Sequence, residues 1–310
     1  MSGAAPLHAR GGSLSPLVWG RLLRLSLAPT AAADVLAGLV LAGSGTLPSV
    51  HLTALLVGAS LCLYHGNLIL NDWHDRGSDA RERPTRPLPS GAIAPTAALA
   101  GAVLLCLAGL VLATLAGVRA ASWMGAVGLT AVLYNVRARG ARSGPLLLAL
   151  CRAGNLAVGL FVLGVPLGRP WAAPVVYGAY LFCVARLGRL EDGADTDLRS
   201  GRPQRHLRLA ALLLVAGGLA LVSLPPAACE LGAVALTLAA AAGLLHRARG
   251  DQVWSRGAVE GATGMALRRL LALTAAFALA SEGPHGPIVA AAILAGYPLS
   301  WGLRGAFPPS

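Results

Sequence analysis

The chain has 310 residues, of which 55% are hydrophobic and 12% are charged, and its formal net charge at pH 7 is +12. This composition carries more apolar surface than a soluble domain of this length can bury. It therefore excludes a soluble fold and predicts an all-helical integral membrane protein. The basic residues are all arginines that lie between apolar runs without interleaved aromatic residues. The positive charge consequently does not indicate binding to nucleic acid.

Nine apolar runs are long enough to cross a bilayer as helices of about 20 residues. They lie at residues 25–45, 52–71, 94–117, 119–135, 145–167, 171–188, 207–224, 228–246 and 286–303. We expect residues 1–310 to form one membrane domain, with residues 1–24 as a polar cytoplasmic lead-in. A shorter stretch at 266–281 begins with Arg268 and Arg269 and could be a tenth span. The two arginines favour an interfacial or partly re-entrant helix there.

The arginines also indicate the orientation in the membrane. They cluster in the lead-in and after the second, fourth, sixth and eighth apolar runs, whereas the opposite loops carry only Arg119 and Arg169, with Arg304 near the far end. Positive residues accumulate in cytoplasmic loops, so the arginine-rich loops are predicted to be cytoplasmic. Of the 13 acidic residues, eight form two clusters on this same side, after the second and the sixth runs.

The first acidic cluster continues directly from the second apolar run, in the sequence NDWHDRGSDARERPTRPLPS at residues 71–90. If the helix continues, Asp72, Asp75 and Asp79 stand at i, i+3 and i+7 on one face, with Asn71 beside them. Carboxylates this close repel one another, and a divalent cation that prefers oxygen ligands, such as Mg²⁺, would offset the repulsion.

A basic, proline-rich loop follows this cluster and contains Arg81, Arg83 and Arg86. The guanidinium fork suits phosphate oxygens, so the acidic cluster and the arginines together predict a diphosphate bridged by metal. The alternative is a set of ordinary surface ion pairs, each worth about 0 to 1 kcal/mol.

The pattern NDxxDxxxD followed by RPxRPLPSG resembles the first signature of the UbiA superfamily of intramembrane prenyltransferases. The matching residues are Asn71, Asp72, Asp75, Asp79, Arg83, Pro84, Arg86, Pro87, Leu88, Pro89, Ser90 and Gly91. The sequence of residues 79–91 and the CRAGN segment at 151–155 most resemble the EboC-like branch of that superfamily. The resemblance is tight over about residues 64–95.

The resemblance implies the UbiA prenyltransferase fold, a bundle of nine transmembrane helices around a central cavity that is capped by cytoplasmic loops. It implies that Asn71, Asp72 and Asp75 bind Mg²⁺ that bridges a prenyl diphosphate, with Asp79 as a further candidate ligand. Arg83 and Arg86 would then bind the diphosphate. Asp72 and Asp75 are the carboxylates expected to carry the catalysis.

The superfamily usually has a second motif of DxxD or DxxxD type, whereas this chain has RLEDGADTDLRSGRP at residues 189–203. The motif can be read as Asp192 with Asp195, as Glu191 with Asp195, or as Asp195 with Asp197. Gly193 loosens a helix at this point. We favour Asp192 and Asp195 as the second pair of metal ligands, because i and i+3 share a helix face.

Further candidates lie at the end of the fourth run and inside the apolar runs. In the resemblance, Tyr134, Arg137 and Arg139 hold the diphosphate or stabilise the cation; the alternative is an interfacial tyrosine with snorkelling arginines. Asp34, Arg152 and Asn155 lie within apolar runs, where ionisable and amide groups are costly. Pairing of Asp34 with Arg152 would neutralise both. These three residues are either structural or line an acceptor pocket.

The sequence thus predicts a Mg²⁺-dependent prenyltransferase that moves an isoprenyl group from a prenyl diphosphate to an aromatic or other lipophilic acceptor within the lipid bilayer. A phosphatidyltransferase is a weaker alternative, because DGADTD lacks the expected DGxxAR pattern. A non-catalytic bundle that binds or transports an isoprenoid is the second alternative, and the irregular second motif is its support.

Overall fold

The computed structural model describes residues 15–136, 143–191, 201–249 and 254–307, which are almost entirely helical. In chain order the helices are α1 (Pro16–Leu22), the short 3-10 helix η1 (Leu25–Leu27), α2 (Ala28–Ala42), α3 (Val50–Glu82), α4 (Pro95–Leu115), α5 (Val118–Val136), α6 (Ser143–Val162), η2 (Arg169–Trp171), α7 (Ala172–Gly188), α9 (Arg202–Leu219), α10 (Ala228–Arg247), α11 (Arg256–Leu279) and α12 (His285–Ala306). Among the described residues, eight helices are long and apolar enough to cross a membrane. The chain is therefore a multi-pass membrane protein.

Each of the nine predicted apolar runs coincides with one of the helices α2 to α7, α9, α10 and α12. The stretch at 266–281, by contrast, is part of α11, a helix of 24 residues that is one of the eight candidate spans. The interfacial or re-entrant interpretation of this stretch was therefore wrong. Arg269 is accommodated inside the bundle next to Gly243 of α10, where a Cβ would lie 2.7 Å from its guanidinium.

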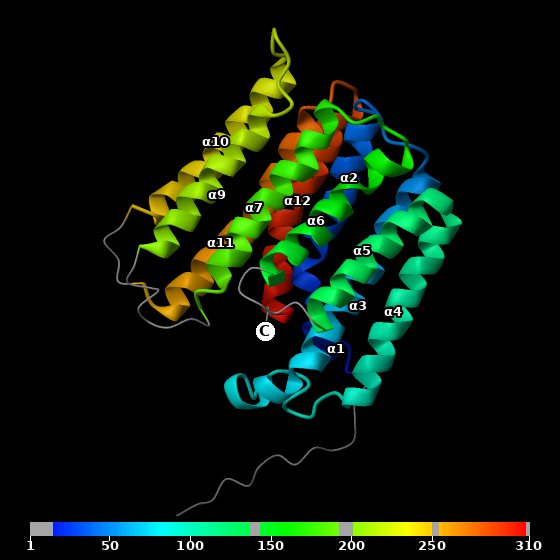
Figure 1. The fold of residues 1–310 in the computed structure, drawn as a ribbon, viewed down its shortest axis with the longest axis vertical. Coiled ribbons are helices and arrows are strands. Elements are labelled where there is room, and N and C mark those ends of the chain that lie inside the picture. Colours follow the sequence, from blue (N-terminus) through cyan, green and yellow to red (C-terminus); the bar gives the residue numbers. More distant parts are fainter. Residues whose placement is uncertain (1–14, 137–142, 192–200, 250–253, 308–310) are drawn as a thin grey trace, which may run out of the picture.

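Helix α2 lies in the middle of the bundle, where it packs against α3, α6, α11 and α12. Figure 1 shows α4 at one edge and the pair α9 and α10 at the opposite edge. The C-terminal ends of α3, α5, α7 and α10 and the N-terminal ends of α4, α6, α9 and α11 share one side of the bundle (Figure 1). We call this the motif side, because the first acidic cluster lies there.

Two glycines allow α2 and α6 to cross with their backbones in contact. A Cβ added to Gly38 would overlap the carbonyl oxygen of Leu156, and a Cβ added to Gly159 would lie 2.5 Å from the carbonyl carbon of Gly38. Small residues at helix crossings have this function in membrane bundles. The close crossing brings polar side chains of α2 and α6 within hydrogen-bonding distance of each other.

Helix α3 is much longer than a bilayer requires. Its 33 residues extend over roughly 50 Å at 1.5 Å per residue, against a hydrocarbon core of about 30 Å. The last turns, which contain the first acidic cluster, project from the motif side of the bundle (Figure 1). The expected helical continuation of residues 71–82 is therefore confirmed, and the helix ends before Pro84, as a proline requires.

Candidate active site

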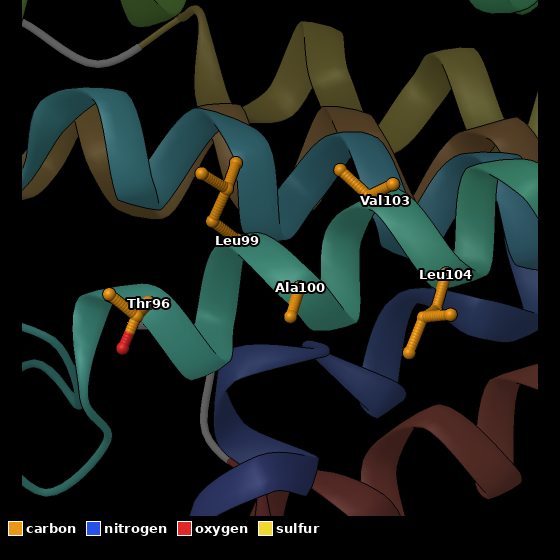
Figure 2. A pocket seen from close by; sticks show the side chains of 5 residues that line it. All are labelled: Thr96, Leu99, Ala100, Val103 and Leu104. Atoms are coloured by element: carbon orange, nitrogen blue, oxygen red, sulfur yellow. The ribbon is translucent and has the colours of Figure 1, made fainter.

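Two hollows differ sharply in chemistry. A groove of about 460 Å³ lies on the outer face of α4 and is lined by Thr96, Leu99, Ala100, Val103 and Leu104 (Figure 2). These side chains come from one lipid-facing helix, and the groove offers only one hydroxyl group for chemistry. A second hollow of about 310 Å³ lies between α3, α5, α6, α7 and α11 on the motif side, and it contains charged and amide groups. We call this second hollow the cavity.

The cavity is polar at its mouth and apolar in its depth. It is lined by Asn71, Asp75, Tyr134, Pro145, Leu148, Leu181, Val184, Ala185, Gly188, Arg189, Thr263 and Leu267. Helix α6 begins at Ser143 on the motif side and α7 ends there at Gly188, so Leu148 and Leu181 are the deeper lining positions on these two helices. Such a hollow suits an amphiphilic molecule with an anionic head and an apolar tail.

The first acidic cluster faces two ways. Asn71 and Asp75 stand one helical turn apart and both line the cavity. Asp72 and Asp79 do not line it; their side chains are buried, with 4% and 6% of their surface exposed. Seven residues make almost two complete helical turns, so Asp72 and Asp79 share a face that is rotated away from that of Asn71 and Asp75. Spacing predicted that the acidic cluster faces one way. In the structure, Asn71 and Asp75 face the cavity, whereas Asp72 and Asp79 do not.

Each buried aspartate of this cluster forms an ion pair with an arginine. Nη2 of Arg24 donates to Oδ1 of Asp72 over 2.7 Å, and Nη1 of Arg86 donates to Oδ2 of Asp79 over 2.7 Å. Oδ2 of Asp72 is buried and has no hydrogen-bond partner in the described part of the chain. These contacts tie the segment before α2 and the loop after α3 to the projecting end of α3.

Arg24 was missed as a site residue, because an arginine before the first span is already explained by membrane orientation. Its backbone lies in the left-handed region, at φ 51°, which is uncommon for a residue other than glycine. The preceding carbonyl, that of Leu23, lies 2.7 Å from Nδ1 of His65 on α3. Backbone and side-chain contacts together hold Arg24 against α3.

The predicted basic loop makes more protein contacts than expected. Arg83 donates to Glu191 over 3.2 Å, which links the end of α3 to the chain just after α7. Pro87 and Leu88 are buried, and Leu88 packs in a small core with Ile69 and Leu22. Neither Arg83 nor Arg86 lines the cavity, whereas Arg189, which the sequence did not single out as a site residue, does.

The described residues contain no group of three or more His, Cys, Asp or Glu side chains that could hold a metal ion. Asn71 and Asp75 nevertheless supply amide and carboxylate oxygens on the cavity wall, and Mg²⁺ accepts one or two such ligands together with phosphate oxygens and water. They therefore fit one part of a magnesium–diphosphate site. The predicted partners Asp192, Asp195, Arg137 and Arg139 lie outside the described residues.

Tyr134 at the end of α5 also lines the cavity. The next residue, Asn135, is buried and donates from Nδ2 to the backbone oxygen of Asn67 on α3 over 3.0 Å. This contact fixes the end of α5 against α3, one turn before Asn71. Tyr134 is thereby held on the wall next to that of Asn71 and Asp75.

Asp34, Arg152 and Asn155 are all buried, and the expected pairing of Asp34 with Arg152 is confirmed. Oδ2 of Asp34 lies 3.0 Å from Nη2 of Arg152 and accepts from Nδ2 of Asn155 over 3.1 Å. The hydroxyl of Tyr177 donates to Oδ1 of Asp34 over 2.5 Å, and Ser60 donates to Oδ1 of Asn155 over 2.8 Å. We call these five residues the buried polar cluster. None of them lines the cavity.

Comparison with known sequences identifies a family and one relative that matches over part of its length. The model of the UbiA prenyltransferase family matches residues 31–259. A digeranylgeranylglyceryl phosphate synthase from Methanothrix thermoacetophila is 43% identical over 75 residues, which are 24% of this chain and 28% of that protein. The chain thus matches little more than a quarter of that relative's length.

Comparison with solved structures shows the same fold. A UbiA homologue from Archaeoglobus fulgidus bound to GPP and Mg²⁺ has a TM-score of 0.58 at 16% identity, over 93% of this chain and 99% of that one. A structure from work on digeranylgeranylglyceryl phosphate synthase in membranes has a TM-score of 0.56 at 16% identity, over 86% and 97% of the two chains. At these identities the likeness concerns the fold.

Proposed function

The chain belongs to the UbiA prenyltransferase family, and we propose that it transfers an isoprenyl group from a prenyl diphosphate to a lipophilic acceptor in a Mg²⁺-dependent reaction. The observation that carries the proposal is the cavity on the motif side. Its mouth holds Asn71, Asp75 and Arg189, and its depth is walled by Leu148, Leu181 and Leu267. An anionic diphosphate fits the first group and an isoprenoid chain fits the second.

In this proposal, Asn71 and Asp75 hold one side of the metal site, and Asp192 and Asp195 are the partners proposed on the other side. Bound there, Mg²⁺ would neutralise diphosphate oxygens as the carbon–oxygen bond breaks. Arg189 donates to the diphosphate, together with the proposed Arg137 and Arg139. Tyr134 faces the reacting carbon, and the apolar walls exclude water from the allylic cation.

We propose a supporting role for the other members of the first acidic cluster. Asp72 and Asp79 would have to release Arg24 and Arg86 before they could bind a metal ion. Their pairs instead hold the segment before α2 and the loop after α3 against the end of α3 that carries Asn71 and Asp75. Arg83, paired with Glu191, fixes the loop that covers this end of α3.

For the acceptor, we propose a lipid-soluble molecule. The Methanothrix relative is named a digeranylgeranylglyceryl phosphate synthase, and one structural neighbour comes from work on such a synthase, which supports this proposal. Asp34 pairs with Arg152 and accepts a hydrogen bond from Asn155, so we propose that these residues are structural and that the acceptor enters elsewhere. We also propose that the chain belongs to an EboC-like branch of the family. The sequences of residues 79–91 and 151–155 support this assignment.

For topology, we propose ten spans with the motif side in the cytoplasm. Helices α5 and α9 are not among the eight most apolar spans, but each connects ends that lie on opposite sides of the bundle. With α11 included, the ten helices α2 to α7 and α9 to α12 cross, one more than the nine that the resemblance implied. The arginine-rich loops support the cytoplasmic assignment.

A non-catalytic isoprenoid carrier is the second candidate, and the irregular second motif at residues 189–203 is the observation that favours it. Purified protein incubated with Mg²⁺, geranylgeranyl diphosphate and candidate acceptors separates the two. The transferase releases diphosphate only when Mg²⁺ is present. A carrier binds the prenyl diphosphate equally well and releases none with any acceptor.

A further inference from the structure

The buried polar cluster lies directly beyond the deep end of the cavity. On α6, Leu148 lines the cavity and Arg152 follows one helical turn deeper on the same face. On α7, which runs in the opposite direction, Leu181 lines the cavity and Tyr177 lies one turn deeper. The two deeper residues meet each other, because Nη2 of Arg152 and the hydroxyl of Tyr177 are 3.0 Å apart.

Helix α3 completes the same layer. Tyr64 lies two helical turns deeper than Asn71 on the same face, and the guanidinium carbon of Arg152 lies 5.3 Å from the centre of its ring. Three walls of the cavity therefore end on one connected set of large side chains. Tyr177 is fully buried and Arg152 is 7% exposed, so little free space remains in this layer.

Hydrogen bonds make this layer difficult to displace. Asp34 accepts from both Tyr177 and Asn155 and pairs with Arg152, and Nη2 of Arg152 also donates to the backbone oxygen of Thr30 over 3.2 Å. Within a membrane, opening such a cluster would leave polar groups without partners in an apolar medium. An isoprenoid chain that reaches Leu148 and Leu181 thus meets a closed surface rather than a flexible apolar wall.

We propose that Tyr177, Arg152 and Tyr64 form the floor of the prenyl cavity and determine the length of donor chain that the cavity can hold. This inference rests on the proposed prenyl-diphosphate site and adds a specificity-determining layer to it. The first isoprene units fill the space above the floor. The rest of a longer chain turns sideways between helices, where it gains little further binding energy.

The test measures affinity in detergent for inorganic pyrophosphate and for dimethylallyl, geranyl, farnesyl and geranylgeranyl diphosphates, each with Mg²⁺. Tyr177→Ala removes the ring and deepens the cavity, so the affinity for the longest donor relative to the shortest rises by about tenfold, as expected when further methylene groups are buried. Tyr177→Phe keeps the ring. The dependence of affinity on donor chain length, which we call the length profile, stays that of the wild type in this variant.

Tyr64→Ala is the second opening variant, at a position that is only partly buried, in case Tyr177→Ala does not fold. Val175→Ala is the matched control, because Val175 lies two residues from Tyr177 on the lipid-facing side of α7 and is 69% exposed. If the opening variants fold and their length profile is unchanged, the proposal that these residues form the floor is contradicted. Wild-type protein that binds no prenyl diphosphate more tightly than pyrophosphate would instead refute the proposed function.

Discussion

Arg24 and Asp72 are joined by a 2.7 Å hydrogen bond between Nη2 and Oδ1, although they are 48 residues apart in the chain. The bond attaches the segment before α2 to the projecting end of α3. Both side chains are largely buried, with 18% and 4% of their surface exposed. The pair therefore holds the helix that carries Asn71 and Asp75 in a fixed position relative to the start of the first span.

Arg24→Gln leaves the Asp72 carboxylate buried without its cation. Removing one partner of a buried pair is costly, so we expect the free energy of unfolding to fall by about 3 kcal/mol. Unfolding by a denaturing detergent, followed by circular dichroism, measures the loss. Arg21→Gln is the control, because Arg21 is exposed on α1. Equal stability of the two variants would show that the pair contributes nothing.

Arg189→Gln removes a cation from the mouth of the cavity. A charge-assisted hydrogen bond to a diphosphate is worth about 1.5 to 3 kcal/mol, so KM for the prenyl diphosphate should rise by about 10- to 100-fold. Steady-state kinetics with varied donor concentration give the value. Arg205→Gln removes an exposed cation from α9 on the same side and should leave KM unchanged. A similar rise in both variants would indicate a general charge effect.

Gly159→Ala introduces a methyl group where α6 touches the backbone of α2. The helices must move apart, and we expect a loss of about 1 to 3 kcal/mol in the free energy of unfolding. Gly125→Ala on α5 is the matched control, because a Cβ there would meet no atom within 4 Å. A Gly159→Ala protein as stable as the control would mean that the close crossing is not required.

Asp34 and Arg152 should show strong coupling in a double-mutant cycle. Arg152→Met or Asp34→Asn alone leaves a buried charge without its partner and should cost about 3 to 5 kcal/mol. The double variant should cost less than the sum by about 2 kcal/mol or more, because neither charge then remains. Thermal unfolding of the four proteins in one detergent gives the coupling energy. Additive losses would contradict a direct interaction.

Much of the fold could be predicted from the sequence. The nine apolar runs marked nine helices correctly, because an apolar stretch of sufficient length is a local property of the chain. The pairing of Asp34 with Arg152 was predictable for a different reason: two opposite charges in apolar runs must neutralise each other in a membrane. The helix at 256–279 was misjudged, since the space that Gly243 provides for Arg269 depends on tertiary packing.

The candidate site was less predictable in detail. Spacing showed that Asn71, Asp72, Asp75 and Asp79 lie close together on a helix. The rotation of α3 in the bundle, which spacing cannot determine, decides which of them face the cavity. Tyr177 gave no signal, because a tyrosine in an apolar run resembles any other large core residue. The contact of Arg24 with Asp72 could not be predicted, because the two residues are 48 positions apart in the chain.

The release of diphosphate from geranylgeranyl diphosphate in the presence of candidate lipophilic acceptors, with and without Mg²⁺, tests the central claim most directly. The purified proteins to compare are wild type, Asp75→Asn and Glu82→Gln. Glu82 is an exposed acid at the end of the same helix. We predict Mg²⁺-dependent release by wild type and Glu82→Gln, and a loss of at least about 100-fold in Asp75→Asn, as for removal of a group that stabilises developing charge. Wild-type rates in folded Asp75→Asn would contradict the account.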